Sequence, residues 1–204
     1  MADLNLNFLE SIGALITESH VVYTSGKHGK SYVNKDAIYP HTELTARICQ
    51  AMAEPFYTTE IDAVLAPAIG GMILGHGIAA ALSRHQKKEI LSVYAEQTPE
   101  KSFVIKRGYD ALIRNQKVLV VEDVLTTGGS VRKVIEVART IPCEVVGVSA
   151  LCNRGALTAE LLGNVPRLQS LFHIQLEAWD AAECPLCAKK IPVNMSIGKG
   201  SKQA

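Results

Sequence analysis

One stretch of the chain, residues 118–130, constrains the fold more than any other. It begins with four apolar residues, Val118–Val121, which predict a strand buried on both faces, as in a parallel sheet. Two carboxylates, Glu122 and Asp123, follow at once, and then comes a loop of small hydroxyl and glycine residues, Thr126–Ser130. The residues after this loop carry apolar side chains at helical spacing. The stretch therefore predicts a strand, a ligand-binding loop and a helix in succession.

The chemistry of this stretch points to a phosphate with a sugar beside it. Loop amides and a helix N-terminus favour an anion, and glycines let that anion approach the backbone. The carboxylates of Glu122 and Asp123 suit hydrogen bonds from sugar hydroxyls, as an acidic residue does for ribose in dinucleotide folds. The alternative is that the acidic pair merely ends a strand and that Thr127–Gly129 is an ordinary turn. With the whole stretch intact, we favour a phosphoribosyl pocket.

Length, charge and cysteine content narrow the class of protein. A chain of 204 residues suits one domain with a substantial core, and a formal net charge of +1 suggests neither a nucleic-acid nor a membrane partner. Five cysteines without disulfide-framework spacing fit a reducing compartment. The N-terminus lacks the basic segment of a signal peptide, and glycines interrupt the longest apolar stretch, near 69–82. We therefore expect a soluble, cytoplasmic protein.

Strands and helices alternate along most of the chain. Helices are expected at about 8–16, 42–56, 72–84 and 131–139, and strands at 21–23, 31–34, 62–66, 90–95, 103–106, 118–121, 145–151 and 168–176. The first two strands are expected to pair around the polar connector 25–29. This order predicts an α/β fold with a central, mainly parallel sheet flanked by helices.

Three loops are expected at the carboxyl edge of that sheet, where ligands bind in such folds. They are Pro67–Gly71, Glu96–Lys101 and Asp123–Ser130. The two glycines and free amides of Pro67–Gly71 suit a second anion, a pyrophosphate, although a helix start that needs glycine for close packing would look similar. Two phosphate sites that flank a sugar site are what 5-phosphoribosyl 1-diphosphate (PRPP) requires.

These motifs resemble those of the type I phosphoribosyltransferases, and the wider pattern is similar to the orotate phosphoribosyltransferase branch with a C-terminal Cys-Pro-Leu-Cys. The matching segments, which cover most of the chain, are Thr24–His28 with Tyr32, Pro67–Gly71, Tyr94–Glu96, Lys106–Gly108, Val118–Ser130, Asn153–Gly155 and Glu183–Cys187.

The resemblance implies an organisation and an activity. It implies the type I phosphoribosyltransferase fold as a single domain, 1–204, with a core of about 41–154 and a small hood subdomain formed by about 1–40 and 155–204. The implied activity is transfer of the 5-phosphoribosyl group from PRPP to orotate, giving orotidine 5'-phosphate and pyrophosphate in pyrimidine (UMP) biosynthesis. Mg²⁺ bound through PRPP and a homodimer are implied as well. A purine or another base as acceptor, or a non-catalytic PRPP-binding regulator, remain alternatives.

The resemblance also implies roles for single residues. Lys27, Thr127 and Arg154 are implied to bind orotate, and the planar fork of Arg154 suits a carboxylate. Asp123, Glu122 and Lys101 are implied to be catalytic. The implied PRPP-binding residues are Ala68, Ile69, Gly70, Gly71, Glu122, Asp123, Val124, Leu125, Thr126, Thr127, Gly128, Gly129 and Ser130.

The segment Glu96–Arg107 resembles a mobile lid, often donated by the neighbouring subunit, and departs from the family pattern. Lys101, Lys106 and Arg107 are candidates to neutralise the departing pyrophosphate, and Lys101 is preferred. Where the family has an Arg-Lys-Glu-x-Lys run, this chain has Tyr-Ala-Glu-Gln-Thr, and Gly70 stands where a lysine is frequent. Both departures reduce positive charge at the leaving group.

Cys184 and Cys187 have the spacing of half a zinc site. No second cysteine pair is present, so we expect a structural role for this segment in preference to a metal shared between chains. His28, His41, His76, His85 and His173 show no catalytic or metal-binding spacing, and no Ser-His or Cys-His nucleophile is evident.

Overall fold

The structure is a computed structural model that describes residues 4–23 and 25–198, so Thr24 of the expected hood motif lies outside the described residues. Its contacts divide the chain into two compact units. The terminal unit joins the residues up to His41 with those from Gln175 onward, and the core unit is Thr42–Ile174. Each unit is described by itself below.

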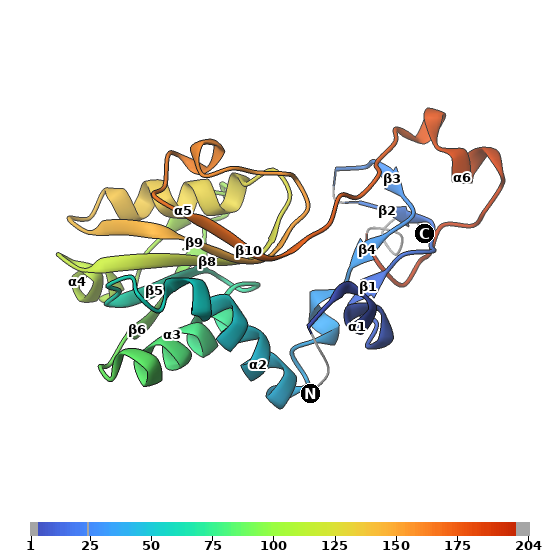
Figure 1. Cartoon of the computed structure of the whole chain (residues 1–204). Coiled ribbons are helices and arrows are strands. Elements are labelled where there is room, and N and C mark those ends of the chain that lie inside the picture. The colour runs from blue at the N-terminus through green and yellow to red at the C-terminus, as the bar shows by residue number, and fades with distance from the viewer. Residues whose placement is uncertain (1–3, 24, 199–204) are drawn as a thin grey trace. The chain divides into compact units, whose positions relative to one another are not determined.

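The core unit is built on a six-stranded sheet with the order β10-β9-β8-β5-β6-β7 (Figure 1). Neighbouring strands are parallel except β6 and β7. The strands are β5 (Ala63–Pro67), β6 (Leu91–Gln97), β7 (Phe103–Val104), β8 (Lys117–Leu125), β9 (Glu144–Asn153) and β10 (Leu168–His173). The predicted α/β fold with a mainly parallel sheet is confirmed.

Helices cover both faces of this sheet. Helices α2 (Thr42–Ala53) and α3 (Met72–Gln86) lie on one face, and α5 (Gly129–Arg139) lies on the other (Figure 1). Because both faces are covered, the residues of Val118–Val121 are completely buried. The remaining helical segments of the core unit are short: η2 (Glu54–Phe56), α4 (Tyr109–Ile113) and η3 (Glu160–Leu162).

The predicted amphipathic helix after the glycine-rich loop is α5. Val131, Val134, Ile135 and Ala138 are buried in the main hydrophobic cluster together with Val118 and other residues of the sheet. Their spacing of three and four residues places them on one face of the helix. This packing fixes the helix start, and with it the preceding loop, against the sheet.

Strand β8 is longer than its apolar run predicts. It continues through Glu122 and Asp123 to Leu125, because β9 beside it supplies partners as far as Asn153, which is opposite Leu125. Strand β10 adds a further parallel strand beside β9. The segment 155–174 therefore belongs to the core unit, although the expected hood begins at about residue 155.

The terminal unit consists of short elements. They are α1 (Leu6–Ser11), β1 (Leu15–Ile16), β2 (Val21–Val22), β3 (His28–Gly29), β4 (Tyr32–Val33), η1 (Lys35–Ala37), η4 (Ala181–Glu183) and α6 (Pro185–Ala188). Strand β1 pairs with β4, and β2 pairs with β3, both antiparallel. Across residues 4–23 and 25–198, no helix has the length and apolar character needed to cross a membrane.

Two predictions for the terminal unit are wrong. The first helix ends near residue 12 and does not reach Ile16, because Gly13 takes the left-handed conformation that ends helices, with φ +72°. The strand at 21–23 does not pair with 31–34. The amide of Tyr23 donates to the carbonyl of Lys27 at 2.8 Å, so the hairpin turns back earlier than expected.

The contact between α2 and α3 generates a stability prediction. A methyl group at Gly77 of α3 would overlap the buried sulfur of Cys49 on α2. In a helix, Gly→Ala normally stabilises by roughly 0.5–1 kcal/mol. Here we expect Gly77→Ala to lower the free energy of unfolding by about 1–3 kcal/mol through overpacking, as measured by urea denaturation. In a Cys49→Ala background the loss should shrink, and a stabilised Gly77→Ala single variant would contradict this packing.

Candidate active site

Three segments of the core unit meet at the carboxyl edge of the sheet. The β5–α3 loop contacts the end of β8, since a methyl group at Gly70 would overlap Oδ2 of Asp123. The segment after β9 contacts the β8–α5 loop, since a methyl group at Gly155 would overlap the carbonyl oxygen of Thr126. Of the three loops expected to converge at this edge, the structure brings Pro67–Gly71 and Asp123–Ser130 together.

The β8–α5 loop encloses a small hollow with a volume of about 160 Å³. Helix α5 begins at Gly129, so the amides of its first turn face the end of the loop. Gly128 has φ +71°, which permits the sharp entry into the helix. The hollow is lined by Glu122, Val124, Leu125, Thr126, Thr127, Gly128, Gly129, Ser130 and Val131. This combination of free amides, hydroxyls and a helix N-terminus suits a phosphate group.

The carboxylates of Glu122 and Asp123 are buried and lie on opposite sides of strand β8. Glu122 is 6% exposed and Asp123 is 8% exposed. Because both lie within β8, their side chains point to opposite faces of the sheet. Glu122 lines the phosphate-sized hollow, and Asp123 faces Gly70 of the β5–α3 loop. The amide of Val124 donates to Oδ1 of Asp123 at 2.6 Å, which helps to fix that carboxylate.

The β5–α3 loop, Ala68–Gly71, has a glycine, Gly70, at the position where the family frequently has a lysine. The amide of Ala68 donates to the carbonyl of Ala95 on β6 at 2.8 Å, and the peptide bond between Ala68 and Ile69 is cis. The side chain of Ile69 is 84% exposed. Gly70 has no room for a side chain unless Asp123 moves. The glycine at this position therefore lets the Asp123 carboxylate approach the loop backbone, and a side chain here would require that carboxylate to shift.

Arg154 follows β9 directly and lies beside the β8–α5 loop. Its amide donates to the carbonyl of Leu125 at 2.9 Å, and its side chain is half-buried. Two residues earlier, burial raises the pKa of Cys152 to about 12. That thiol stays protonated at neutral pH and is not a nucleophile.

The expected lid is a short hairpin formed by β6 and β7. Two of its cations already have a partner, because Arg107 Nε lies 2.8 Å and Lys106 Nζ 3.8 Å from the carboxylate of Glu96. Lys101 lies in the turn with φ +61°, and its carbonyl accepts a hydrogen bond from Lys133 Nζ at 2.5 Å. Lys133, on the exposed face of α5, carried no signal in the sequence that would have connected it with the lid.

The other residue implied to bind the base, Lys27, belongs to the terminal unit. There its Nζ lies 3.1 Å from Oδ2 of Asp180, in an exposed ion pair. Exposed pairs of this kind contribute little to stability and exchange readily with other partners.

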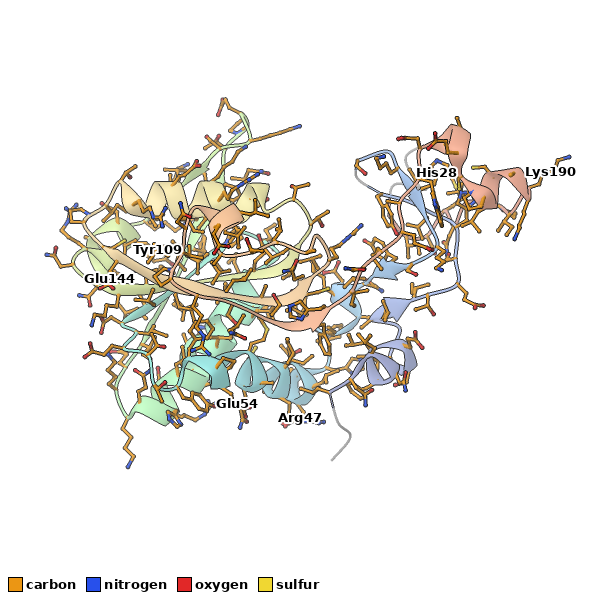
Figure 2. The ribbon with its side chains drawn as sticks, turned by 45° about the horizontal axis from the view of Figure 1, so that its top comes forward. His28, Arg47, Glu54, Tyr109, Glu144 and Lys190 are labelled. Carbon is orange, nitrogen blue, oxygen red and sulfur yellow. The ribbon has the colours of Figure 1, made fainter. Side chains whose placement is uncertain are left out.

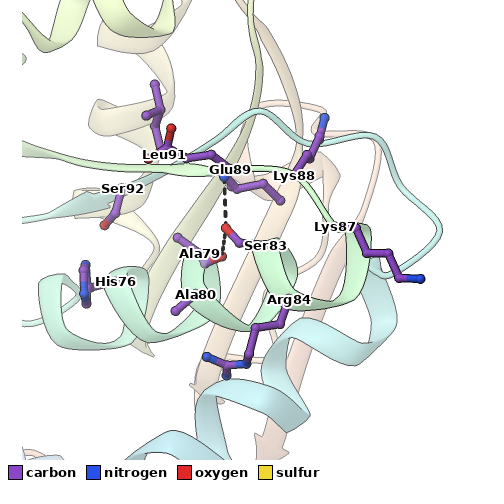
Figure 3. Close-up of a pocket in the computed structure, with 11 residues that line it drawn as sticks. His76, Ala79, Ala80, Ser83, Arg84, Lys87, Lys88, Glu89, Leu91 and Ser92 are labelled. Atoms are coloured by element: carbon purple, nitrogen blue, oxygen red, sulfur yellow. Dashed lines mark hydrogen bonds between the residues drawn. The ribbon is translucent and has the colours of Figure 1, made fainter.

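A larger groove elsewhere in the core unit is not the candidate site. It lies between the C-terminal half of α3 and the start of β6, where Ser83 Oγ donates to the carbonyl of Ala79 and accepts from the amide of Ile90 (Figure 3). Leu91 and Ser92 mark the amino end of β6. Ligands of parallel sheets bind at the opposite, carboxyl end.

Comparison with known proteins gives the class of the chain. Residues 34–182 match the phosphoribosyl transferase domain. The chain belongs to the phosphoribosyltransferase family, which confirms the resemblance seen in the sequence.

Single related proteins give a narrower comparison than the domain family does. The orotate phosphoribosyltransferase of Desulforamulus reducens is 33% identical to this chain over 97% of the chain and 96% of its own length. Among solved structures, orotate phosphoribosyltransferase from Aeropyrum pernix superposes with a TM-score of 0.63 at 24% identity, covering 82% of this chain and 92% of that one. Adenine phosphoribosyltransferase from Thermoanaerobacter pseudethanolicus gives 0.60 at 17% identity, covering 81% and 99%. At these identities the solved structures show the fold alone.

The two glycines at the start of α5 give a matched pair of variants. A methyl group at Gly128 would meet Leu157 and Leu162 and would need the left-handed conformation, whereas one at Gly129 makes only ordinary contacts. We expect Gly128→Ala to lower the free energy of unfolding by about 1–3 kcal/mol. Gly129→Ala should leave it unchanged or raise it by up to roughly 1 kcal/mol. Chemical denaturation measures both, and equal effects would show that the loop does not have this geometry.

Proposed function

We propose that this chain transfers the 5-phosphoribosyl group of PRPP to orotate, forming orotidine 5'-phosphate and pyrophosphate in de novo pyrimidine biosynthesis. The observation that carries the proposal is the buried acidic pair between two anion-binding loops. Asp123 abuts the backbone of Gly70, and Glu122 lines the hollow of the β8–α5 loop. PRPP has the same order of groups, a phosphate and a diphosphate on either side of a ribose.

The proposed reaction is a displacement at the anomeric carbon of the ribose. The bond from this carbon to the diphosphate oxygen breaks, a bond to the orotate nitrogen forms, and positive charge develops on the ribose in between. The proton of that nitrogen leaves to the departing diphosphate or to water, so the step balances. Glu122 and Asp123 accept hydrogen bonds from the ribose hydroxyls, and their negative charge favours that cation-like centre. Thr126–Ser130 hold the 5'-phosphate and Ala68–Gly71 hold the diphosphate, so that positioning supplies much of the rate enhancement.

The residues at this edge fit the Mg²⁺ that the resemblance implies. Mg²⁺ prefers carboxylate and phosphate oxygens and keeps several waters. Asp123, a carboxylate beside the proposed diphosphate loop, would help to hold the ion, and oxygens of PRPP would supply further ligands. When bound, the ion neutralises charge on the diphosphate as it leaves. We propose Lys101 as the lid cation that assists; Lys106 and Arg107 would first have to leave their exposed ion pairs with Glu96.

The proposed acceptor, orotate, is supported by Arg154 and by the relatives. An arginine fork beside the phosphate loop suits the carboxylate of orotate, and a relative that is 33% identical over 97% of the chain is an orotate phosphoribosyltransferase. Thr127 in the loop and Lys27 in the terminal unit are the other proposed orotate-binding residues. The homodimer remains a proposal that rests on the lid resemblance, and the cytoplasmic location remains a prediction.

A panel of bases tests the proposal. The full chain is incubated with PRPP, Mg²⁺ and orotate, uracil, adenine or hypoxanthine, and pyrophosphate release is measured. Of the four bases, we expect only orotate to give pyrophosphate release. Turnover of a purine with none of orotate would overturn the acceptor. Tight PRPP binding without pyrophosphate release from any base would instead support a non-catalytic PRPP-binding protein.

Arg154 provides a residue-level prediction. Arg154→Ala should raise the KM for orotate at least tenfold, about 1.4 kcal/mol, because it removes a charge-assisted contact to the base carboxylate. The Kd for PRPP should stay within about twofold, since the donor is held by the two loops. Arg154→Lys should have a KM for orotate between that of the unchanged chain and that of Arg154→Ala, because lysine keeps the charge and lacks the planar fork.

The control for this prediction is Arg132→Ala, on the exposed side of α5, where the guanidinium contacts only the carbonyl of Leu161 at 3.4 Å among the interactions found in the described part of the chain. Arg132→Ala should leave the KM for orotate and the Kd for PRPP unchanged. If Arg154→Ala weakened orotate and PRPP equally, Arg154 would be needed for the loop structure and not for the base.

A further inference from the structure

The terminal unit holds four metal-ligating side chains that phosphoribosyl transfer does not use. His20, His28, Cys184 and Cys187 each offer one ligand atom, and these atoms all lie within 4.8 Å of one another. His20 and Cys184 are 2% exposed and His28 is 8% exposed, while Cys187 is half-buried. Two histidines therefore lie beside the two cysteines, for which the sequence shows no second cysteine pair.

Two separate parts of the chain contribute these residues. His20 directly precedes β2 and His28 lies in β3, so both belong to one hairpin. Cys184 precedes α6 and Cys187 lies within it. Backbone hydrogen bonds of 2.8 Å in both directions between His28 and Trp179 join the hairpin to the C-terminal segment. Figure 2 shows His28 beside that segment.

Three nitrogen–sulfur distances within the cluster are close to those of a tetrahedral site. His20 Nε2 lies 3.6 Å from the sulfur of Cys184 and 3.6 Å from that of Cys187, and His28 Nδ1 lies 3.3 Å from the sulfur of Cys187. Bond lengths of about 2.05 Å to nitrogen and 2.3 Å to sulfur place tetrahedral nitrogen and sulfur ligands about 3.5 Å apart. The two ring nitrogens, 2.8 Å apart, need to separate by about 0.5 Å to reach the same geometry.

The surroundings hold one histidine in the orientation a metal needs. His20 Nδ1 lies 2.6 Å from the carbonyl oxygen of Ile191. A carbonyl only accepts, so Nδ1 carries the proton, and the lone pair of Nε2 faces the cluster. A ring nitrogen that donates to a backbone carbonyl while the other binds metal is the usual second contact of a ligating histidine.

We propose that His20, His28, Cys184 and Cys187 bind one Zn²⁺ as a closed, structural site. Two imidazoles and two thiolates in tetrahedral array suit Zn²⁺ better than the oxygen-preferring Mg²⁺ or Ca²⁺. The two thiolate charges balance the charge of the ion, so the buried site is neutral and its burial is inexpensive. Because the protein supplies all four ligands, no position is open for water or substrate, which separates this site from a catalytic zinc.

The proposed zinc joins parts of the chain that are far apart in sequence. His28 and Cys187 are 159 residues apart. The described elements of this unit are at most six residues long, so a metal cross-link supplies order that its short strands and helices provide only weakly.

The metal content of the purified full chain tests the proposal directly. The protein is prepared without chelators in reducing buffer, and first-row metals are measured by mass spectrometry. We expect about one zinc per chain. Metal-free protein titrated with Co²⁺ should show the visible absorption of a tetrahedral site together with thiolate charge-transfer bands. A chain that holds no zinc and takes none up, or one that holds iron in place of zinc, would overturn the assignment, as would a Cys184–Cys187 disulfide in the protein as prepared.

Variants show whether these four residues are the ligands. Cys184→Ser and His28→Ala should each lower the zinc content at least tenfold, and Cys143→Ser, in the core unit, should retain it. His28→Cys should also retain zinc, because three cysteines and one histidine form a common zinc set; this separates loss of a ligand from loss of folding. Full zinc content in Cys184→Ser or His28→Ala would overturn the proposal, whatever the activity of the enzyme.

Discussion

The parallel pairing of β8 with β9 is the interaction on which the candidate active site depends. With Leu125 opposite Asn153, the two strands end together, and the amide of Arg154 bonds to the carbonyl of Leu125. The same register sets which faces of the sheet receive Glu122 and Asp123. A shift of one residue would exchange the faces of both carboxylates and separate them from the loops they now meet.

Much of the core unit could be predicted because its information is local. A buried strand, a small-residue loop and an amphipathic helix occur in one continuous stretch, and β8 and α5 follow it closely. The extension of β8 through its two carboxylates could not be predicted, since acidic residues disfavour strands and only the partner strand supplies the reason. The fit between Gly70 and Asp123 is likewise a contact between loops far apart in sequence.

The terminal unit could be predicted far less well. Its strands are two residues long, too short for periodicity to separate Leu15–Ile16 from the preceding helix. The proposed zinc ligands could be predicted only in part. The spacing of Cys184 and Cys187 is visible in the sequence, whereas the two histidines come together only when the hairpin folds. In the lid, the partners of single charged residues could not be predicted from the sequence. Two of the candidate cations for the diphosphate, Lys106 and Arg107, form ion pairs with Glu96.

We propose that PRPP lies across the carboxyl edge of the sheet, with the acidic pair at its ribose. A crystal structure of the full chain with PRPP and Mg²⁺ tests this placement. We expect the 5'-phosphate within hydrogen-bonding distance of the amides of Thr126–Ser130, the diphosphate at Ala68–Gly71 and the ribose hydroxyls at Glu122 and Asp123. PRPP bound elsewhere, as in the groove between α3 and β6, or bound with its two ends exchanged, would contradict it.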